Sequence, residues 1–204
     1  MDTISIGSGA VMEYLGRTGL DALKGADMLK VAPDQYSSNV EYANIPLAKK
    51  LRDISMIHQA NLGTRIFYAE HGGFDTHASQ APNHAKLWEE ASIAISDFWD
   101  DLRENDAADN VVMFLFSEFG RRVKENGSGT DHGSGGVSFA IGPSIKGGTY
   151  NDYPDMSEDA LVEGDLRPSL DFRGLYSTIL EDWFDLESEH IVNGKFTKPQ
   201  FVSK

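Results

Sequence analysis

The chain has 204 residues, of which 40% are hydrophobic and 25% are charged, a composition that allows one globular domain with a buried core. Its formal net charge of −14 disfavours nucleic acids and anionic membrane surfaces as partners. No apolar run reaches the roughly 18 residues that a transmembrane helix needs, so the sequence predicts no membrane span. The chain also has no cysteine, which excludes disulfides, thiolate catalysis and zinc–thiolate sites.

The first 44 residues are weakly patterned, and we expect only short helical stretches at 10–15 and 19–29. The N-terminus lacks a basic region followed by a long apolar one, so it predicts no signal peptide. Beyond Ile45, apolar residues recur at helical spacing until Gly63, which predicts a helix between these two residues.

A strand–helix–strand alternation is expected in the middle of the chain. Arg65–Ala69 (RIFYA) has the composition of a strand, and residues 82–102 carry the apolar stripe of a long amphipathic helix. The almost continuous apolar run Asn110–Phe116 (NVVMFLF) is typical of a parallel strand buried on both faces. Residues 117–136 are polar and rich in glycine, which indicates a loop, and a short strand is expected at Val137–Ile141. The alternation predicts a βαβ unit with a parallel sheet.

A last helix is predicted to start near Asp171, because apolar residues keep a spacing of three or four from Phe172 to Phe184. We therefore divide the chain into a helical N-terminal segment (1–44), an α/β core (45–186) and a C-terminal tail (187–204).

The first polar cluster is GGFDTHASQ, residues 72–80, directly after the first predicted strand. Asp75 and His77 are two residues apart, which places both side chains on one face of an extended segment. A carboxylate and an imidazole together suit zinc, manganese or iron. An equally good interpretation is a turn in which Asp75 accepts backbone N–H groups and His77 is exposed.

The second cluster, FSEFGRR at 116–122, follows the second predicted strand. Glu118 would emerge at the carboxyl edge of the sheet, where it could bind a metal or act as a general base. Arg121 and Arg122 could bind an anionic group, because a guanidinium matches the oxygens of phosphate or sulfate. A solvated loop face is the alternative for at least one of these arginines.

The third cluster, GSGTDHGSGG at 127–136, surrounds Asp131 and His132 with five glycines, which let a backbone approach a ligand closely. Adjacent residues of an extended chain point to opposite sides, so we expect only one of the two to contact a given metal. The alternative is a flexible loop without a ligand. His84 lies near the first cluster and could support it from outside the ligand set. The predicted metal ligands are Asp75, His77, Glu118, Asp131 and His132.

These clusters, with KGGTY at 146–150 and DFRGLY at 171–176, resemble the family named domain of unknown function 1501 over roughly residues 40–185. That family is similar to the alkaline phosphatase and sulfatase superfamily. Members of the superfamily carry an Asp-x-x-x-His pair, a Ser-Asp-His-Gly turn after a strand, and a later His. The resemblance assigns Asp75 and His77 to the pair, 117–120 (Ser-Glu-Phe-Gly) to the turn, and His132 to the later His. It implies an α/β fold, a three-layer α/β/α sandwich with a mostly parallel sheet, whose N-terminal part is missing.

The same resemblance implies metal-dependent hydrolysis of phosphate or sulfate esters, with a small anionic ester as substrate and zinc or manganese as the cofactor. Glu118 would be a ligand or base, Asp131 a ligand or a group just behind the ligands, and Arg121 an anion clamp. Family members are exported, so the resemblance also implies a periplasmic or secreted protein.

Two departures from the superfamily pattern change these expectations. The first pair is spaced Asp-x-His, and Glu118-Phe119 stands where Asp-His would supply two ligands, so we expect one metal rather than two. The superfamily's nucleophile lies on an N-terminal strand and helix before the matched region, so we expect a C-terminal fragment with little activity alone. The alternatives are a non-catalytic exported module that binds a metal or a glycan, and a structural domain that binds nothing.

Overall fold

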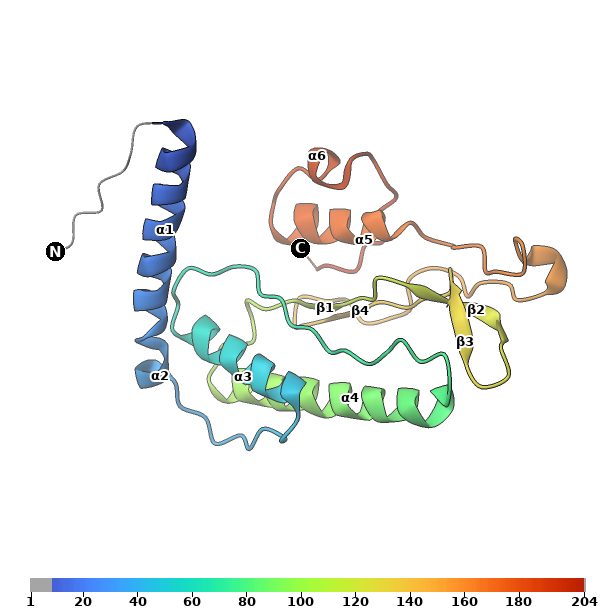
Figure 1. Cartoon of the computed structure of the whole chain (residues 1–204), viewed down its shortest axis with the longest axis horizontal. Helices are drawn as coiled ribbons and strands as arrows, with labels where there is room; N and C mark the ends of the chain where they lie inside the picture. The colour runs from blue at the N-terminus through green and yellow to red at the C-terminus, as the bar shows by residue number, and fades with distance from the viewer. Residues whose placement is uncertain (1–8, 204) are drawn as a thin grey trace. The chain divides into compact units, whose positions relative to one another are not determined.

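The computed structural model describes residues 9–203 (Figure 1). These residues form two compact units. Unit 1 contains the described residues up to His71 together with Glu90–Ala107. Unit 2 contains Gly72–Glu89 and the chain from Ala108 to the last described residue. The prediction that the chain carries no signal peptide rests partly on residues 1–8, which lie outside the described residues.

Unit 1 is helical. It contains α1 (Ala10–Leu29), α2 (Ala32–Gln35), α3 (Pro46–Gln59) and the second half of α4 (Gln80–Glu104). The two short stretches predicted in the N-terminal segment form the single helix α1. α3 starts with a proline in its first turn, where the missing N–H costs nothing.

The buried apolar side chains of unit 1 lie mainly on α3 and α4, which Figure 1 draws in cyan and green. Both predicted helices are confirmed. The predicted stripe of α4 is buried from Ala91 to Leu102 except for the half-buried Ile95, whereas that of α3 is buried at Leu47 and Leu51 and half-buried from Ile54 onward. The buried apolar residues on these helices are Leu47, Ala48, Leu51, Ala91, Ala94, Phe98, Trp99 and Leu102.

A buried carboxylate lies beside this core. Asp101 is fully buried and accepts hydrogen bonds from the hydroxyls of Tyr36 (2.8 Å) and Tyr42 (2.7 Å). The side-chain amide of Gln59 on α3 donates to its other oxygen at 3.3 Å. Asp101 therefore connects α4 to α3 and to the segment that precedes α3, where Tyr36 and Tyr42 lie.

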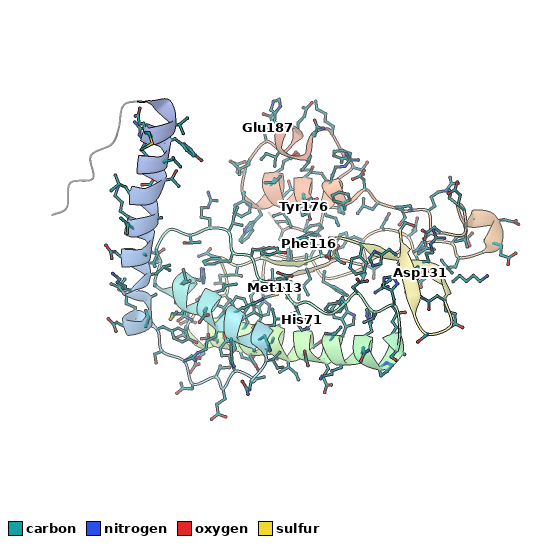
Figure 2. The ribbon with its side chains drawn as sticks, in the orientation of Figure 1. His71, Met113, Phe116, Asp131, Tyr176 and Glu187 are labelled. Carbon is teal, nitrogen blue, oxygen red and sulfur yellow. The ribbon has the colours of Figure 1, made fainter. Side chains whose placement is uncertain are left out.

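Unit 2 contains two small antiparallel sheets. β1 (Met113–Leu115) pairs with β4 (Phe139–Ile141), and β2 (Gly120–Glu125) pairs with β3 (Thr130–Gly133). On the first sheet, Phe116 just after β1 packs edge-on against Tyr176, with ring centroids 5.9 Å apart (Figure 2).

The C-terminal part of unit 2 holds a 3-10 turn (Glu158–Ala160), α5 (Phe172–Thr178), a π-helical turn (Ile179–Trp183) and α6 (Glu189–Val192). The predicted start near Asp171 is confirmed, because the Asp171 carboxylate accepts the backbone N–H of Arg173 as the N-cap of α5. In the tail, Val202 is buried and forms an antiparallel bridge with Ile145.

The prediction of a three-layer α/β/α sandwich with a mostly parallel sheet is wrong, because the described residues pair only in antiparallel two-stranded sheets. Parallel neighbours need a crossover, usually a helix, but the chain between β1 and β4 folds into the β2–β3 hairpin instead. Arg65–Ala69 forms no ladder in the described chain, and the run at 110–116 contributes only three strand residues, all of them half-buried. The apolar run at 110–116 is therefore not a parallel strand buried on both faces.

Of the helices in the described part of the chain, none combines the length and the apolar character that crossing a membrane requires.

Candidate metal centre

Asp75 and His77 lie on the segment between Gly72 and α4, and Thr76 between them is buried. The backbone N–H of Thr76 donates to the Phe74 carbonyl at 2.8 Å, which turns the chain at this point. The Asp75 and His77 side chains remain in contact, with 2.9 Å between Asp75 Oδ1 and His77 Nε2. The spacing of two thus brings a carboxylate and an imidazole together, as the sequence predicts.

His132 and Asp131 come from β3, where Arg121 of β2 pairs directly with His132. The hairpin turns at Asn126-Gly127, and Gly127 takes the positive φ of 99° that favours glycine. The Asn126 side-chain oxygen accepts the backbone N–H groups of Ser128 and Gly129 at 3.2 and 2.9 Å. This turn places β3 beside the segment that carries His77.

Asp75, His77 and His132 form the one group of potential metal-ligand side chains found among the described residues. His132 Nε2 lies 2.7 Å from Asp75 Oδ1, on the same oxygen that His77 Nε2 contacts. The ligand atoms of all three lie within 4.8 Å of one another, and the imidazole rings are 4.9 Å apart. The side chains are 46–62% exposed, so the group is open to solvent.

Asp131 contacts His77 but is not a member of the ligand group. Its Oδ1 lies 3.2 Å from His77 Nδ1 and accepts the side-chain amide of Asn126 at 3.0 Å (Figure 2 labels Asp131). A carboxylate at Nδ1 holds the proton on that nitrogen and leaves the Nε2 lone pair for a metal. Hydrogen bonds from Asn126 and His77 hold the pKa of Asp131 below its ordinary value. The hydrogen bond from His132 does the same for the pKa of Asp75.

Arg121 and Phe119 fix the relative position of the two ligand-bearing segments. The Arg121 guanidinium donates to the carbonyls of Phe74 (2.6 Å) and Thr130, one on each segment. It also lies over the Phe119 ring, which stacks on the His132 imidazole at 4.1 Å with an interplanar angle of 11°. Arg121 therefore braces the site through protein oxygens.

The close approach of the hairpin depends on Gly129, which is buried. A Cβ atom at this position would lie 2.7 Å from the His77 carbonyl oxygen and 2.9 Å from that of Thr76. Both contacts are with backbone, so a larger residue would have to push the two segments apart. These close backbone contacts explain why the third cluster has a glycine at position 129.

A hollow of about 660 Å³ opens beside the two histidines. Asp131 and the charged side chains of Arg122, Lys124, Glu125 and Glu163 also line it. Apart from Gly164, the residues that line it all carry polar or charged side chains.

The structure brings together Asp75, His77, Asp131 and His132 from the predicted site. Glu118 is exposed on the segment between β1 and β2 and lies outside the ligand group, although its neighbour Phe119 stacks on His132. His84 accepts the indole N–H of Trp88 at 2.9 Å rather than supporting a ligand. Sequence reasoning missed Asn126, although an Asn-Gly pair is a strong hairpin signal.

The donor set fits a divalent transition metal, since two imidazole nitrogens and a carboxylate oxygen are ligands that zinc, manganese and iron accept. No curated protein and no solved structure matches the chain. One family matches it over residues 44–192, and its description is "Protein of unknown function (DUF1501)". This match covers most of the chain and includes all three polar clusters, and on that basis the chain belongs to the DUF1501 family.

Proposed function

We propose that this chain binds one divalent metal through Asp75, His77 and His132, and that the site hydrolyses phosphate or sulfate esters. The observation that carries the proposal is the convergence of a carboxylate and two imidazoles from segments more than 50 residues apart on one open point of the surface. Catalytic metal sites have three protein ligands and keep a position for water or substrate, whereas structural sites are closed by a fourth.

Each residue around the group has a role in this proposal. Asp75, His77 and His132 would hold the ion, and Asp131 would keep the proton on His77 Nδ1. A divalent ion held there would supply Lewis-acid activation of water near neutral pH. Arg121 and Phe119 would keep the two ligand-bearing segments in register. Glu118 remains a predicted base or additional ligand.

The resemblance to the alkaline phosphatase and sulfatase superfamily supports the choice of reaction. The motifs occur in the superfamily's order, and the residues assigned to the Asp/His pair and to the later His are the ones in contact. Ser117 precedes Glu118, and Thr76 lies between Asp75 and His77 in the sequence. Ser117 Oγ donates to the Phe119 carbonyl at 2.9 Å, and Thr76 is buried, so neither is presented as a nucleophile. We therefore expect slow turnover by this chain.

Calorimetric titration with zinc and manganese tests the metal site. Wild type should bind one ion, and His132→Ala should bind it far more weakly, because two remaining ligands rarely hold a metal. His190→Ala is the matched control, since His190 is exposed on α6 and outside the ligand group. Equal affinity of wild type and His132→Ala would refute the site.

Hydrolysis of p-nitrophenyl phosphate and p-nitrophenyl sulfate by the metal-loaded protein tests the reaction. We expect a slow rate that is lost in Asp75→Ala and kept in His190→Ala. One-to-one metal binding with no turnover of either ester would favour the non-catalytic module that binds a metal or a glycan.

A further inference from the structure

Arg122 and Lys124 are the two cationic side chains that line the hollow beside the histidines. They lie two residues apart on β2, and both are exposed. Arg121 is engaged by protein oxygens on both ligand-bearing segments, whereas Arg122 and Lys124 face the hollow itself. The anion-binding role predicted for an arginine of this cluster therefore fits Arg122, with Lys124, better than Arg121.

The other charges around the hollow limit which anion it suits. Glu125, Asp131 and Glu163 also line it, and Asp75 contacts both of the histidines that line it. Without a metal these carboxylates outnumber the cations, so the hollow should repel anions. A bound divalent ion would bring the positive and negative charges into balance. A bound monoanion would then leave the site with about one negative charge in excess and a bound dianion with about two, so the site suits a monoanion better.

We propose that the hollow binds a monoanionic ester group, a sulfate monoester or a phosphodiester, between the metal and the side chains of Arg122 and Lys124. This inference rests on the proposed function, because the charge balance includes the metal. Glu125 and Glu163 act as specificity-determining residues that disfavour the dianionic phosphomonoesters.

Calorimetric titration of the zinc-loaded protein at pH 8 tests the proposal with three small probes. Methyl sulfate and dimethyl phosphate are monoanions, whereas methyl phosphate is a dianion, because the second pKa of a phosphate monoester is about 6. Methyl sulfate or dimethyl phosphate should bind more tightly than methyl phosphate, and the stronger of the two identifies the ester class. The protein without zinc should bind none of them.

Charge-neutralising variants separate the two kinds of side chain. Arg122→Gln and Lys124→Gln should weaken binding of every probe. Glu125→Gln and Glu163→Gln should each raise the affinity for methyl phosphate relative to methyl sulfate by about fivefold, the effect of one unit charge at close range in water. Glu187→Gln is the matched control, since Glu187 is exposed and outside the hollow.

The outcomes distinguish this inference from the proposed function. If zinc does not bind, the proposed function fails and the anion subsite fails with it. If zinc binds but methyl phosphate is the preferred probe, or Arg122→Gln with Lys124→Gln binds like wild type, the subsite alone is overturned. Three results together would confirm the subsite. The protein should prefer a monoanionic probe, the arginine and lysine variants should bind all probes more weakly, and the glutamate variants should gain affinity for methyl phosphate.

Discussion

At Asp75, one carboxylate oxygen contacts two imidazole nitrogens, at 2.7 and 2.9 Å. The sequence selects these three residues as candidate ligands, because Asp and His are residue types that bind transition metals, and the structure places their side chains together. It predicts their partners less well. Asp131 is an ambiguous candidate until its contact with His77 Nδ1 places it behind the ligands, and Phe119 carries no signal of its stacking on His132. The residue type indicates which ligand chemistry a side chain can supply, whereas the fold determines which side chains lie next to one another.

Asp131→Asn should weaken metal binding without removing a ligand. The amide can still accept from His77 Nδ1, but it lacks the charge that favours the Nδ1–H form and raises the basicity of Nε2. We expect the zinc dissociation constant to rise by about 10- to 100-fold, as for other partners of metal-bound histidines. Competition titration against a chelating dye measures this. Asp155→Asn, in an exposed loop outside the ligand group, is the control. An unchanged constant in Asp131→Asn would remove Asp131 from the site.

Helices and strands differ in how far the sequence predicts them. α3, α4 and α5 follow from periodicity, because one face of each carries the apolar residues and the pattern is local. The sheets depend on pairing between distant segments, which a single sequence does not encode locally. Polar residues and glycines dominate residues 117–136 and predict a loop there, yet this stretch contains β2 and β3. An exposed hairpin needs no alternation of apolar and polar residues, so the hydrophobic pattern gives no signal for β2 and β3.

The β2–β3 hairpin gives an element-scale prediction at Gly129. Gly129→Ala would place Cβ against the backbone carbonyls of His77 and Thr76, so the two ligand-bearing segments must separate. We expect a loss of roughly 1–3 kcal/mol in the free energy of unfolding, the usual cost of overpacking, together with weaker zinc binding. Gly136→Ala is the matched control, because an added methyl group there would have no neighbour within 4 Å and its φ is not in the left-handed region. Urea unfolding and zinc calorimetry of both variants measure the difference. Equal behaviour would show that the close approach is dispensable.

Asp101 gives a second element-scale prediction, in unit 1. Burial alone raises the pKa of Asp101, but hydrogen bonds from Ser55, Tyr42 and Tyr36 outweigh it, and the pKa lies below its ordinary value. A depressed pKa in the folded state stabilises the protein above the unfolded-state pKa, and this stability is lost as the pH falls through the folded-state pKa. The loss should therefore begin below about pH 4.

Asp101→Asn should remove that pH dependence. It should also cost roughly 1–3 kcal/mol at pH 7, because the amide nitrogen would face donors such as Gln59 that need an acceptor. Urea unfolding between pH 7 and pH 3 measures both effects. Asp100→Asn is the control on the same helix, since its ion pair with Arg103 is exposed and such pairs contribute little. A pH profile of Asp101→Asn parallel to that of wild type would contradict the assignment.

Across the whole molecule, the candidate site and the main apolar core belong to different compact units. Asp75, His77, Asp131 and His132 are all in unit 2, whereas most of the buried apolar side chains of the described chain are in unit 1. Unit 2 relies on two small sheets, hydrogen-bonded loops and few buried apolar residues. A ligand that binds the folded state stabilises the part of the chain that must be folded to hold it. Metal should therefore matter most to the stability of unit 2.

Amide hydrogen exchange with and without zinc tests this division. Zinc at about 100 times its dissociation constant stabilises the binding-competent state by about 2.7 kcal/mol, which slows exchange through unfolding of that state about 100-fold. We expect this protection in β2 and β3, which carry Arg121 and His132, and little change in α3 of unit 1. His132→Ala should show no protection in either region, because it lacks a ligand. Equal protection of α3 and the hairpin would mean that the two units unfold together. Protection that survives in His132→Ala would mean that zinc binds elsewhere.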